Sequence, residues 1–592
     1  MYHAPLKELG FVLHQLIDDG QLEGLPGLAE YSPEFADSVL QEAAKFAEQV
    51  LDPINVLGDQ EGAKWTPDGV RMPPAFKEAY RQFVAGGWPQ LRATQEYGGQ
   101  GAPTVLGTAV EELWGSANLA FKLCPMLTQA VIEAIHRCGT SRQKDLYLPR
   151  LIRGEWTGTM NLTEPQAGSD LGAIRMRAIP EGDSFRLHGQ KIFITYGEHD
   201  YTPNIIHMVL ARIEGAPAGI KGISMFIVPR VLVGADGSLG EPNDVRCVSI
   251  EHKLGIHSSP TCVLSYGEKA GAVGYLVGEP NRGLEYMFIM MNAARLSVGL
   301  EGYALSERAY QHALAYARER VQGRPAQATA PVRDKPLPIV FHADIKRMLL
   351  AMKSQTEAAR AVALYGALQL DLGRYHPDAA TRAAAQARGD LLIPIIKAWA
   401  TEMGVQSASL GVQVHGGMGF IEETGAAQYY RDVRITTIYE GTTGIQANDL
   451  VGRKVGRDGG TAMGALIADM LEELRREAPS DSAGDRSAAL AAVELLKEAT
   501  AKVLEFTGRG PEHVQAIAVP YLMLSGYAIG AWLMARAQSQ AAGRIDEDRG
   551  FYSGKLQTTR FFLQHALHEV RAQAAIVTGG GGAVVEADPD LF

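Results

Sequence analysis

Cysteine is scarce in this chain, and its spacing excludes two kinds of protein. The 592 residues include four cysteines, Cys124, Cys138, Cys247 and Cys262, and no two of them form a CxxC pair. Neither a disulfide framework nor a zinc site is therefore indicated. We expect buried, reduced thiols that pack as small apolar side chains.

An excess of positive charge is also missing. The chain carries 56 Lys and Arg against 67 Asp and Glu, a formal net charge of −11. A protein that wraps nucleic acid needs a basic footprint facing the phosphates. The composition therefore excludes nucleic acid as the main partner.

The N-terminus lacks the pattern of a signal peptide, and the longest uncharged run is interrupted. MYHAPLKELGFVLHQLIDDG places Lys7 and acidic residues among its apolar ones, so we expect a cytoplasmic protein. The run at 514–535 reaches membrane-spanning length, but Gln515, Pro520, Ser525 and two glycines interrupt it. We expect a buried helical hairpin or a bent core helix there, and contact with a membrane surface is left open.

Apolar residues are plentiful, at 46% of the chain. A chain of 592 residues with this composition can bury large cores, and its length indicates three or four domains. The first 155 residues or so show helical periodicity. In SPEFADSVLQEAAKFAEQVLDPI, for example, Ser32 can cap the start of a helix.

The pattern changes along the chain. From about 156 to 275 it becomes alternating and β-branched, which predicts a β domain. From 281 to about 455 the helical period returns, interrupted by a Pro-rich loop at 323–338. A Gly-rich linker at 456–464 precedes Ala-rich helical sequence that finishes in a loose end, TGGGGAVVEADPDLF.

Two motifs lie where the helical pattern gives way to the β pattern. In MNLTEPQAGSD (160–170), Thr163 and Ser169 supply hydroxyls on a Gly-bearing loop that can approach a ligand closely, although an ordinary capped turn is an equal alternative. In KIFITYG (191–197), strand alternation puts Phe193 and Thr195 on one face and Ile192 and Ile194 on the other. Alone, this second segment would be a plain core strand.

The third motif is the most specific, VQVHGGMGFIEETGAAQYYRDVRITTIYEGTTGIQ at 412–446. Gly416 and Gly417 suit a backbone that must approach a pyrophosphate closely, because they carry no Cβ. Glu440 stands alone between a β-branched run and a Gly/Thr stretch. By itself it could be an acid at a helix N-terminus, stabilised by the helix dipole.

The order of helical, β and helical blocks with these motifs resembles the acyl-CoA dehydrogenase flavoproteins over about residues 38–453. The resemblance implies an α+β multidomain fold with an N-terminal helical domain (38–155), a central β-barrel-like domain (156–275) and a C-terminal four-helix bundle (281–455). An N-terminal extension (1–37) and an additional C-terminal helical domain (464–592) resemble a bacterial subgroup. Members of that subgroup act on 3-methylmercaptopropionyl-CoA or on ordinary fatty acyl-CoAs.

The resemblance also implies a reaction: flavin-dependent α,β-dehydrogenation of an acyl-CoA thioester to the trans-2-enoyl-CoA. It implies non-covalent FAD, no metal, electron-transfer flavoprotein as the acceptor and a homodimer that shares each flavin between its subunits. One base must take the α-proton, and a positioned, desolvated carboxylate suits that task. Glu440 matches this base. Some members of the family carry the base at the position of Ala294, where alanine cannot act.

The remaining site residues follow from the same resemblance. The implied FAD contacts are Met160, Leu162, Thr163, Ser169, Phe193, Thr195, Arg320, Gln413, Gly416, Gly417, Thr442 and Gly444. The implied substrate contacts are Ser169, Asn292, Arg295 and Tyr439. Two positions depart from the family: Asn292 replaces an aspartate beside the pantetheine, and Gly323 replaces an aromatic residue near the adenine. A surface helix cation is the alternative for Arg295.

Three other functions stay open at this point. An acyl-CoA oxidase would use the same groups but pass electrons to oxygen, and the sequence does not discriminate. A non-redox, DNA-associated flavoprotein would need basic charge, yet from residue 464 onward 12 Lys and Arg face 17 Asp and Glu, a net of −5. A pure acyl-CoA carrier would not need Glu440.

Overall fold

The computed structural model describes residues 1–325, 336–476 and 483–592, which form two compact units. The first unit comprises Met1–Ala44, Thr104–Ser116 and Arg295–Phe592, and the second comprises Lys45–Pro103 and Ala117–Ala294. The expected Pro-rich loop at 323–338 lies for the most part outside the described residues.

The second unit has a helical part. Its helices are α3 (Asn55–Glu61), α4 (Pro74–Ala85), α6 (Leu119–Cys138) and α7 (Ser141–Ile152), and a short hairpin pairs β1 (Lys64–Thr66) with β2 (Gly69–Arg71). Asn118 begins α6, since its side chain accepts a hydrogen bond from the Phe121 amide at 3.0 Å. Thr140 and Gln143 form a capping box at the start of α7.

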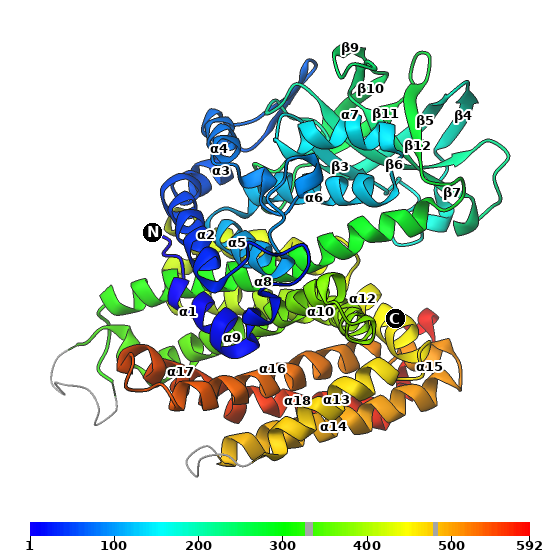
Figure 1. Cartoon of the computed structure of the whole chain (residues 1–592). Helices are drawn as coiled ribbons and strands as arrows, with labels where there is room; N and C mark the ends of the chain where they lie inside the picture. The colour runs from blue at the N-terminus through cyan, green and yellow to red at the C-terminus, as the bar shows by residue number, and fades with distance from the viewer. Residues whose placement is uncertain (326–335, 477–482) are drawn as a thin grey trace. The chain divides into compact units, whose positions relative to one another are not determined.

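The β part of the second unit closes on itself. Its strands are β3 (Thr157–Asn161), β4 (Arg177–Glu181), β5 (Ser184–Thr195), β6 (Ile205–Ile213), β7 (Ile223–Pro229), β10 (Val245–Ile250), β11 (Thr261–Tyr266) and β12 (Ala272–Val277), with a separate hairpin of β8 (Val231–Val233) and β9 (Leu239–Pro242). The sheet runs β10, β11, β5, β12, β7, β6, β3. Because β4 pairs with both β5 and β6, it completes a ring with β12 and β7. The predicted barrel-like domain is confirmed (Figure 1).

Long helices build the first unit. They are α1 (Leu6–Gly10), α2 (Pro33–Phe46), α5 (Thr104–Ala117), α8 (Gly283–Glu319), α9 (Ala343–Tyr375), α10 (Ala379–His415), α11 (Ala426–Val433) and α12 (Thr443–Asp449), of which α8 begins in the second unit. The Ser32 hydroxyl accepts a hydrogen bond from the Phe35 amide at 3.2 Å, as the sequence predicts for the start of α2.

Glycines bring α8 and α10 close together. A Cβ at Gly302 would lie 2.3 Å from the Ala400 carbonyl oxygen, and one at Gly299 would lie 2.6 Å from Ile396. Only glycine fits at such contacts. This close approach places the middle of α8 beside the middle of α10, where the candidate site described below is built.

The C-terminal residues form an additional helical layer of the first unit, as predicted. Its helices are α13 (Thr461–Arg475), α14 (Ala483–Thr507), α15 (Pro511–Gln515), α16 (Ala518–Ala542), α17 (Arg549–Phe561), α18 (Leu567–Gly579) and α19 (Gly582–Val585). Figure 1 shows α13, α14, α16 and α18 side by side in yellow to red. α16 packs on α9 and α10: the Trp399 and Tyr527 rings lie 5.6 Å apart, and a Cβ at Gly526 would lie 2.2 Å from Trp399.

The end of the chain corrects one expectation. The sequence favours a loose end from about 578, but α18 continues to Gly579 and α19 follows after a short turn. Gly580 and Gly581 fit against Phe506 and Ala516, where a Cβ would lie 3.1 and 2.2 Å from those side chains. The glycines are thus packing positions rather than linker residues.

The uncharged run at 514–535 forms most of α16. Of the residues described, this helix is the one long and apolar enough to cross a membrane, but 83% of its most apolar window is buried inside the protein. The expected buried core helix is confirmed. The cysteine expectation also holds: all four are free thiols, three of them buried and Cys138 partly exposed.

A buried ion network ties the N-terminal segment to the C-terminal layer. Lys555 of α17 pairs with Glu8 of α1 and, at 3.1 Å, with Glu357 of α9. The Thr558 hydroxyl donates to Glu357 at 2.6 Å. Arg360, fully buried, pairs with acids of α5 and α8 and lies 3.9 Å from Glu8. Five helices, α1, α5, α8, α9 and α17, therefore share one set of buried charges.

Candidate active site

Glu440 lies in a tight turn of the first unit, between the short 3-10 helix Arg434–Thr437 and α12. Its φ is 55° and that of Gly441 is 92°, both in the left-handed region. That region costs a residue with a Cβ about 1–2 kcal/mol. Thr442 begins α12, where its hydroxyl accepts a hydrogen bond from the Ile445 amide at 3.3 Å. The left-handed conformation of Glu440 persists only where neighbouring groups hold the turn.

Three side chains from three helices hold this turn. The Gln446 amide of α12 donates to the carbonyl oxygens of Glu440 (3.0 Å) and Gly441 (3.3 Å). The Lys397 ammonium of α10 donates to the Gly441 carbonyl oxygen at 2.7 Å. The Tyr439 hydroxyl donates to the buried Glu301 carboxylate of α8. The backbone around Glu440 is therefore fixed from both sides.

The surroundings of Glu440 raise its affinity for a proton. Burial raises the pKa of its carboxyl above the ordinary value, and Glu301 adds to the effect, whereas Arg295 and Lys397 oppose it. Burial also lowers the pKa of Lys397 to about 8, against the pull of Glu440 and Glu301. Burial likewise raises the pKa of Tyr439, so its phenol stays protonated. A carboxylate in this setting suits a general base.

Arg295 is not a surface cation. Its side chain is 2% exposed and pairs with Asp449 at 3.2 Å, and Arg453 pairs with the other oxygen of Asp449 at 2.6 Å. Asn292 lies one turn earlier on α8 and is partly buried. Ala294 is buried, and its side chain has no carboxyl group. The charge of Arg295 acts on Glu440 from within the first unit.

The second unit holds the other group of candidate residues. Met160 is buried at the end of β3, Leu162 and Thr163 follow it partly buried, and Ser169 lies exposed on the loop. Ile192 of β5 donates its amide to the Thr163 carbonyl oxygen at 3.0 Å. The loop therefore runs beside the strand that carries Phe193.

A buried ion pair joins that loop to that strand, and the sequence did not single it out. The Lys191 ammonium donates to Glu164 at 2.9 Å and to the Leu162 carbonyl oxygen at 2.8 Å. Glu164 also accepts from the backbone amides of Arg175 (2.6 Å) and Met176 (3.1 Å). The sequence offered only a slight signal: Lys191 is the one charged residue of KIFITYG, whereas MNLTEPQAGSD contains two, Glu164 and Asp170.

Phe193 departs from simple strand alternation. The pairing of β5 with β11 shifts between Lys191 and Ile194, which leaves one extra residue on β5, and Phe193 takes a φ of 59°. Its ring is 59% exposed, whereas Ile194 is buried and Thr195 is partly buried. The expected face pattern therefore fails at Ile192 because the bulge intervenes, and the bulge turns the Phe193 ring outward.

The adenosine-side candidates lie on the surface of the first unit. Gln413, Gly416, Gly417 and Arg320 are exposed. Gly416 has a φ of 62°, and a Cβ built at either glycine would meet no described atom within 4 Å. Packing within the described chain therefore does not require Gly417. An open, Cβ-free backbone is what close approach of a pyrophosphate would need.

Apolar side chains surround the two glycines on that surface. Phe420 is 87% exposed, and Met418 and Ile421 are also exposed. Isolated exposed apolar residues are ordinary, but a group beside candidate ligand contacts indicates a surface that something covers.

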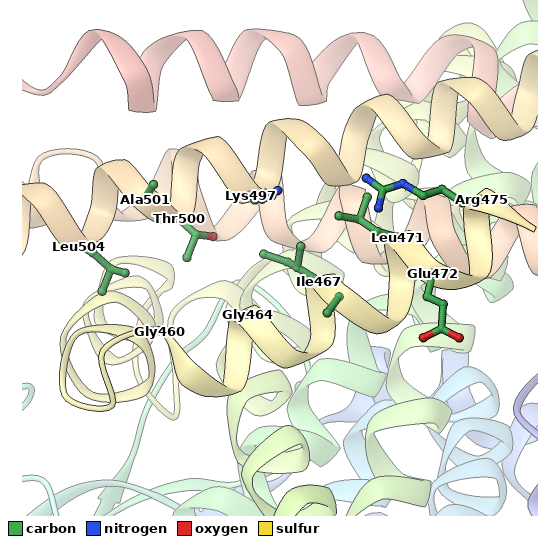
Figure 2. A pocket seen from close by; sticks show the side chains of 11 residues that line it. Gly460, Gly464, Ile467, Leu471, Glu472, Arg475, Lys497, Thr500, Ala501 and Leu504 are labelled. Atoms are coloured by element: carbon green, nitrogen blue, oxygen red, sulfur yellow. The ribbon is translucent and has the colours of Figure 1, made fainter.

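A groove of about 640 Å³ lies elsewhere, between α13 and α14 (Figure 2). Ile467, Leu471 and Leu504 supply apolar side chains to its lining, and Arg475 lies toward the end opposite Leu504, with Lys497 between them. Arg475 pairs with Glu494 at 2.6 Å. None of the candidate site residues lines this groove.

Comparison with known families covers almost the whole chain. Four family models match in order: "Acyl-CoA dehydrogenase, N-terminal domain" at 34–155, "Acyl-CoA dehydrogenase, middle domain" at 159–268, "Acyl-CoA dehydrogenase, C-terminal domain" at 281–455 and "Acetyl-CoA dehydrogenase C-terminal like" at 463–588.

Individual proteins are similar over the same span. The chain is 44% identical to 3-methylmercaptopropionyl-CoA dehydrogenase of Ruegeria pomeroyi, over 99% of both chains. It is 33% identical to a butyryl-CoA dehydrogenase of Syntrophomonas wolfei, over 96% of this chain and 95% of the other. Its fold is similar to that of an acyl-CoA dehydrogenase complexed with FAD from Bacillus anthracis, with a TM-score of 0.75, 22% identity and coverage of 98% and 93%.

Proposed function

The chain belongs to the acyl-CoA dehydrogenase family, and on that premise we propose that Glu440 is the base of its reaction. The enzyme dehydrogenates an acyl-CoA thioester, and the product of the family reaction is the trans-2-enoyl-CoA. The observation that carries the assignment is the held, left-handed turn that presents a carboxylate of raised proton affinity. Ala294 offers no alternative on α8.

The chain's own residues then divide the work. Glu440 removes the α-proton of the thioester and holds it as a neutral carboxyl, which burial favours. Arg295 and Lys397 keep Glu440 ionised until substrate enters, since their positive charges oppose the effect of burial. The backbone amide of Glu440 donates to the thioester carbonyl and stabilises the enolate-like charge. When bound, FAD, the cofactor of the family, would supply the hydride acceptor for the β-carbon.

FAD is held without a covalent bond, one per chain. Thr163, Ser169, Phe193, Thr195, Met160 and Leu162 are the contacts that the second unit would offer to bound FAD, and Thr442 and Gly444 are those that the first unit would offer. Arg320, Gln413, Gly416 and Gly417, also of the first unit, would hold the adenosine diphosphate of the partner's flavin. The open backbone at Gly416 and Gly417 supports this. We expect purified protein to be yellow, and a colourless protein that cannot be reconstituted with FAD would contradict the proposal.

The substrate carries a short acyl chain, with 3-methylmercaptopropionyl-CoA as the first candidate. Two relatives that match almost the full chain are a 3-methylmercaptopropionyl-CoA and a butyryl-CoA dehydrogenase. Asn292, Arg295 and Tyr439 are the proposed contacts near the thioester, with Ser169. The test is anaerobic bleaching of the flavin by a series of acyl-CoAs of increasing length, including the methylmercapto thioester. Bleaching by long chains alone would contradict the short-chain assignment.

The enzyme is a cytoplasmic homodimer that passes electrons to electron-transfer flavoprotein. The exposed group Met418, Phe420 and Ile421 beside the adenosine-side glycines supports a second copy as the cover. Reoxidation of the reduced enzyme in air, followed by stopped flow, checks the acceptor, because rapid reoxidation by oxygen would indicate an oxidase.

Glu440→Gln tests the base directly. We expect acyl-CoA binding to be kept and turnover to fall by about 10²- to 10⁴-fold, because the shape stays while the proton acceptor is lost. The measurement is the rate of anaerobic flavin reduction by substrate.

The exposed acid Glu423 provides the matched control. Glu423→Gln makes the same chemical change without touching the turn and should leave the rate unchanged. A loss of less than about tenfold for Glu440→Gln would assign the base to another residue.

A further inference from the structure

Lys397 is a buried cation beside the proposed base. Its side chain is 0% exposed, and its ammonium donates to the Gly441 carbonyl oxygen at 2.7 Å. Among the described residues, no carboxylate oxygen lies within 4.0 Å of the ammonium nitrogen. Burying an ammonium group with three donors and one acceptor is costly, so such a residue points to a function.

The packing of two helices places this lysine. Gly299 and Gly302 let α8 approach α10, and Lys397 follows directly after Ile396, the residue that Gly299 touches. The charged groups that face Lys397 are Glu440 from the turn, Glu301 and Arg295 from α8, and Glu402 from α10 itself. Glu440 is the proposed base. The carbonyl oxygen that accepts the hydrogen bond from Lys397 belongs to Gly441, the next residue.

We propose that Lys397 is the positioning residue of the base: it anchors the turn that carries Glu440 and supplies the positive charge against which Glu440 ionises. The proposal deepens the function proposed above and rests on Glu440 as the base.

The anchor is geometric. Glu440 stays left-handed because two successive carbonyl groups are held: that of Glu440 by Gln446, and that of Gly441 by Gln446 and Lys397 together. Loss of the Lys397 hydrogen bond releases the turn toward an ordinary backbone conformation, and the carboxylate then moves away from the α-carbon. A displacement of this kind lowers kcat more than it changes KM.

The charge acts separately. A positive Lys397 favours the carboxylate form of Glu440, so its removal raises the pKa of Glu440 further above the ordinary value. The rising limb of the kcat against pH profile then moves to higher pH, by on the order of one pH unit.

Lys397→Met keeps the length and the apolar stem and removes both the donor and the charge. We expect kcat to fall at least tenfold and the rising limb to move to higher pH. Gln446→Leu is the matched control, since it removes two neutral hydrogen bonds to the same turn and no charge. It should lower kcat and leave the limb in place. An unmoved limb in Lys397→Met, or an equal shift in Gln446→Leu, would overturn the electrostatic part of the proposal.

Lys397→Arg keeps a donor and a permanent charge. It should hold the limb near its wild-type position even where kcat falls, and it serves if the methionine variant does not fold. If the rising limb moves as far in Lys397→Arg as in Lys397→Met, the positive charge at this position does not set the pKa of Glu440.

A measurement without substrate separates this proposal from the proposed function. Between pH 8 and 10.5 the folded protein has released the Lys397 proton and the unfolded chain has not, so wild-type stability should rise with pH relative to Lys397→Met. In the Glu440→Gln background the rise should begin at lower pH, because Lys397 has lost an anionic neighbour. Urea titrations measure both effects on four proteins: the wild type, Lys397→Met, Glu440→Gln and the double variant. If no acyl-CoA bleaches the wild-type flavin, the proposed dehydrogenation is wrong, but the interaction between Lys397 and Glu440 is still supported by the stability data. If the pH at which stability begins to rise is the same with and without Glu440→Gln, that interaction is wrong, whatever reaction the enzyme catalyses.

Discussion

Among the residues that the structure describes, six other than glycine have a positive φ, and two of them, Phe193 and Glu440, belong to the candidate site. Such backbone costs on the order of 1–3 kcal/mol and concentrates where function needs a fixed geometry. The sequence identified both residues through their motifs. It could not indicate their conformation, because the partners that hold Glu440 include Lys397, which lies 44 residues before Gly441.

The supports of the site were missed for a physical reason. A lysine is ordinarily solvated, so neither Lys397 of α10 nor Lys191 of β5 stands out without knowledge of burial. The roles of the candidate residues themselves stay predictions, except that the alternative reading of Arg295 as a surface cation is excluded by its burial.

Lys191→Met tests the buried pair of Lys191 and Glu164, which joins the loop at 162–170 to β5. The substitution leaves the Glu164 carboxylate buried without its cation, and breaking such a pair costs about 3–5 kcal/mol. We expect the free energy of unfolding to fall by that order and FAD affinity to fall with it, because the Leu162 carbonyl loses its hydrogen bond. Urea denaturation and fluorescence titration with FAD are the measurements.

The double variant Lys191→Met with Glu164→Gln removes the orphaned charge. It should recover part of the stability but not the FAD affinity. Equal recovery of the unfolding free energy and of the FAD affinity would show that Lys191 acts only by neutralising the charge of Glu164.

At the scale of elements, the β-branched and alternating segments were predicted well as strands, whether exposed on one face as in β5 or buried on both as in β6. The segments FRLHGQKIFITYG and NIIHMVLARI correspond to β5 and β6, and helical blocks were found on both sides of the β domain. The bulge at Phe193 and the closure of the ring by β4 depend on pairing between strands, which the spacing within one strand does not determine.

Two buried histidines, His207 of β6 and His199 on the segment before it, should make the second unit sensitive to acid. Burial lowers the pKa of His199 and of His207 to about 3, and each ring is hydrogen-bonded to a threonine of β3. Between pH 6.5 and 3 the unfolded chain binds protons that the folded chain does not, so stability falls as the pH falls. The loss is about 1.4 kcal/mol per histidine and pH unit.

Urea titrations between pH 7 and 4 measure this loss. His207→Asn should flatten the dependence, whereas the exposed His252→Asn should not change it. The same slope in wild type and His207→Asn would refute the assignment.

At the scale of the whole molecule, the sequence predicted an additional C-terminal helical domain at 464–592, whose apolar helical sequence must bury a face somewhere. α16 does lie on α9 and α10, with Gly526 against Trp399. The consequence for assembly is still a prediction: this layer occupies the face through which smaller members of the family pair their dimers.

Light scattering coupled to size exclusion tests it on the full chain and on a chain ending at Arg457. We expect a homodimer for the first and aggregation or a tetramer for the second, because truncation exposes the apolar surface around Trp399. A tetrameric full chain would rule out the blocking role.

Gly526→Ala tests the same contact without truncation. Its Cβ would lie 2.2 Å from Trp399, so we expect a loss of about 1–3 kcal/mol in unfolding free energy and a larger assembly. Gly464→Ala, whose Cβ meets nothing within 4 Å on α13, should be neutral or stabilising. Similar behaviour of the two variants would show that the contact with Trp399 does not hold the layer in place.

The buried network around Glu8 sets an order of events during synthesis. Lys555 follows Glu8 by 547 residues, so the ribosome has released most of the chain before the acid can meet its cation. Until then Glu8 lacks its Lys555 partner, although Arg360 is made earlier, and the N-terminal segment presents the apolar side chains Phe11, Val12 and Leu13, which are buried in the finished protein. At about 5–20 residues per second, that interval lasts roughly half a minute to two minutes. A nascent chain in this state is a natural client for a chaperone, and the first unit completes its folding only after translation is nearly over.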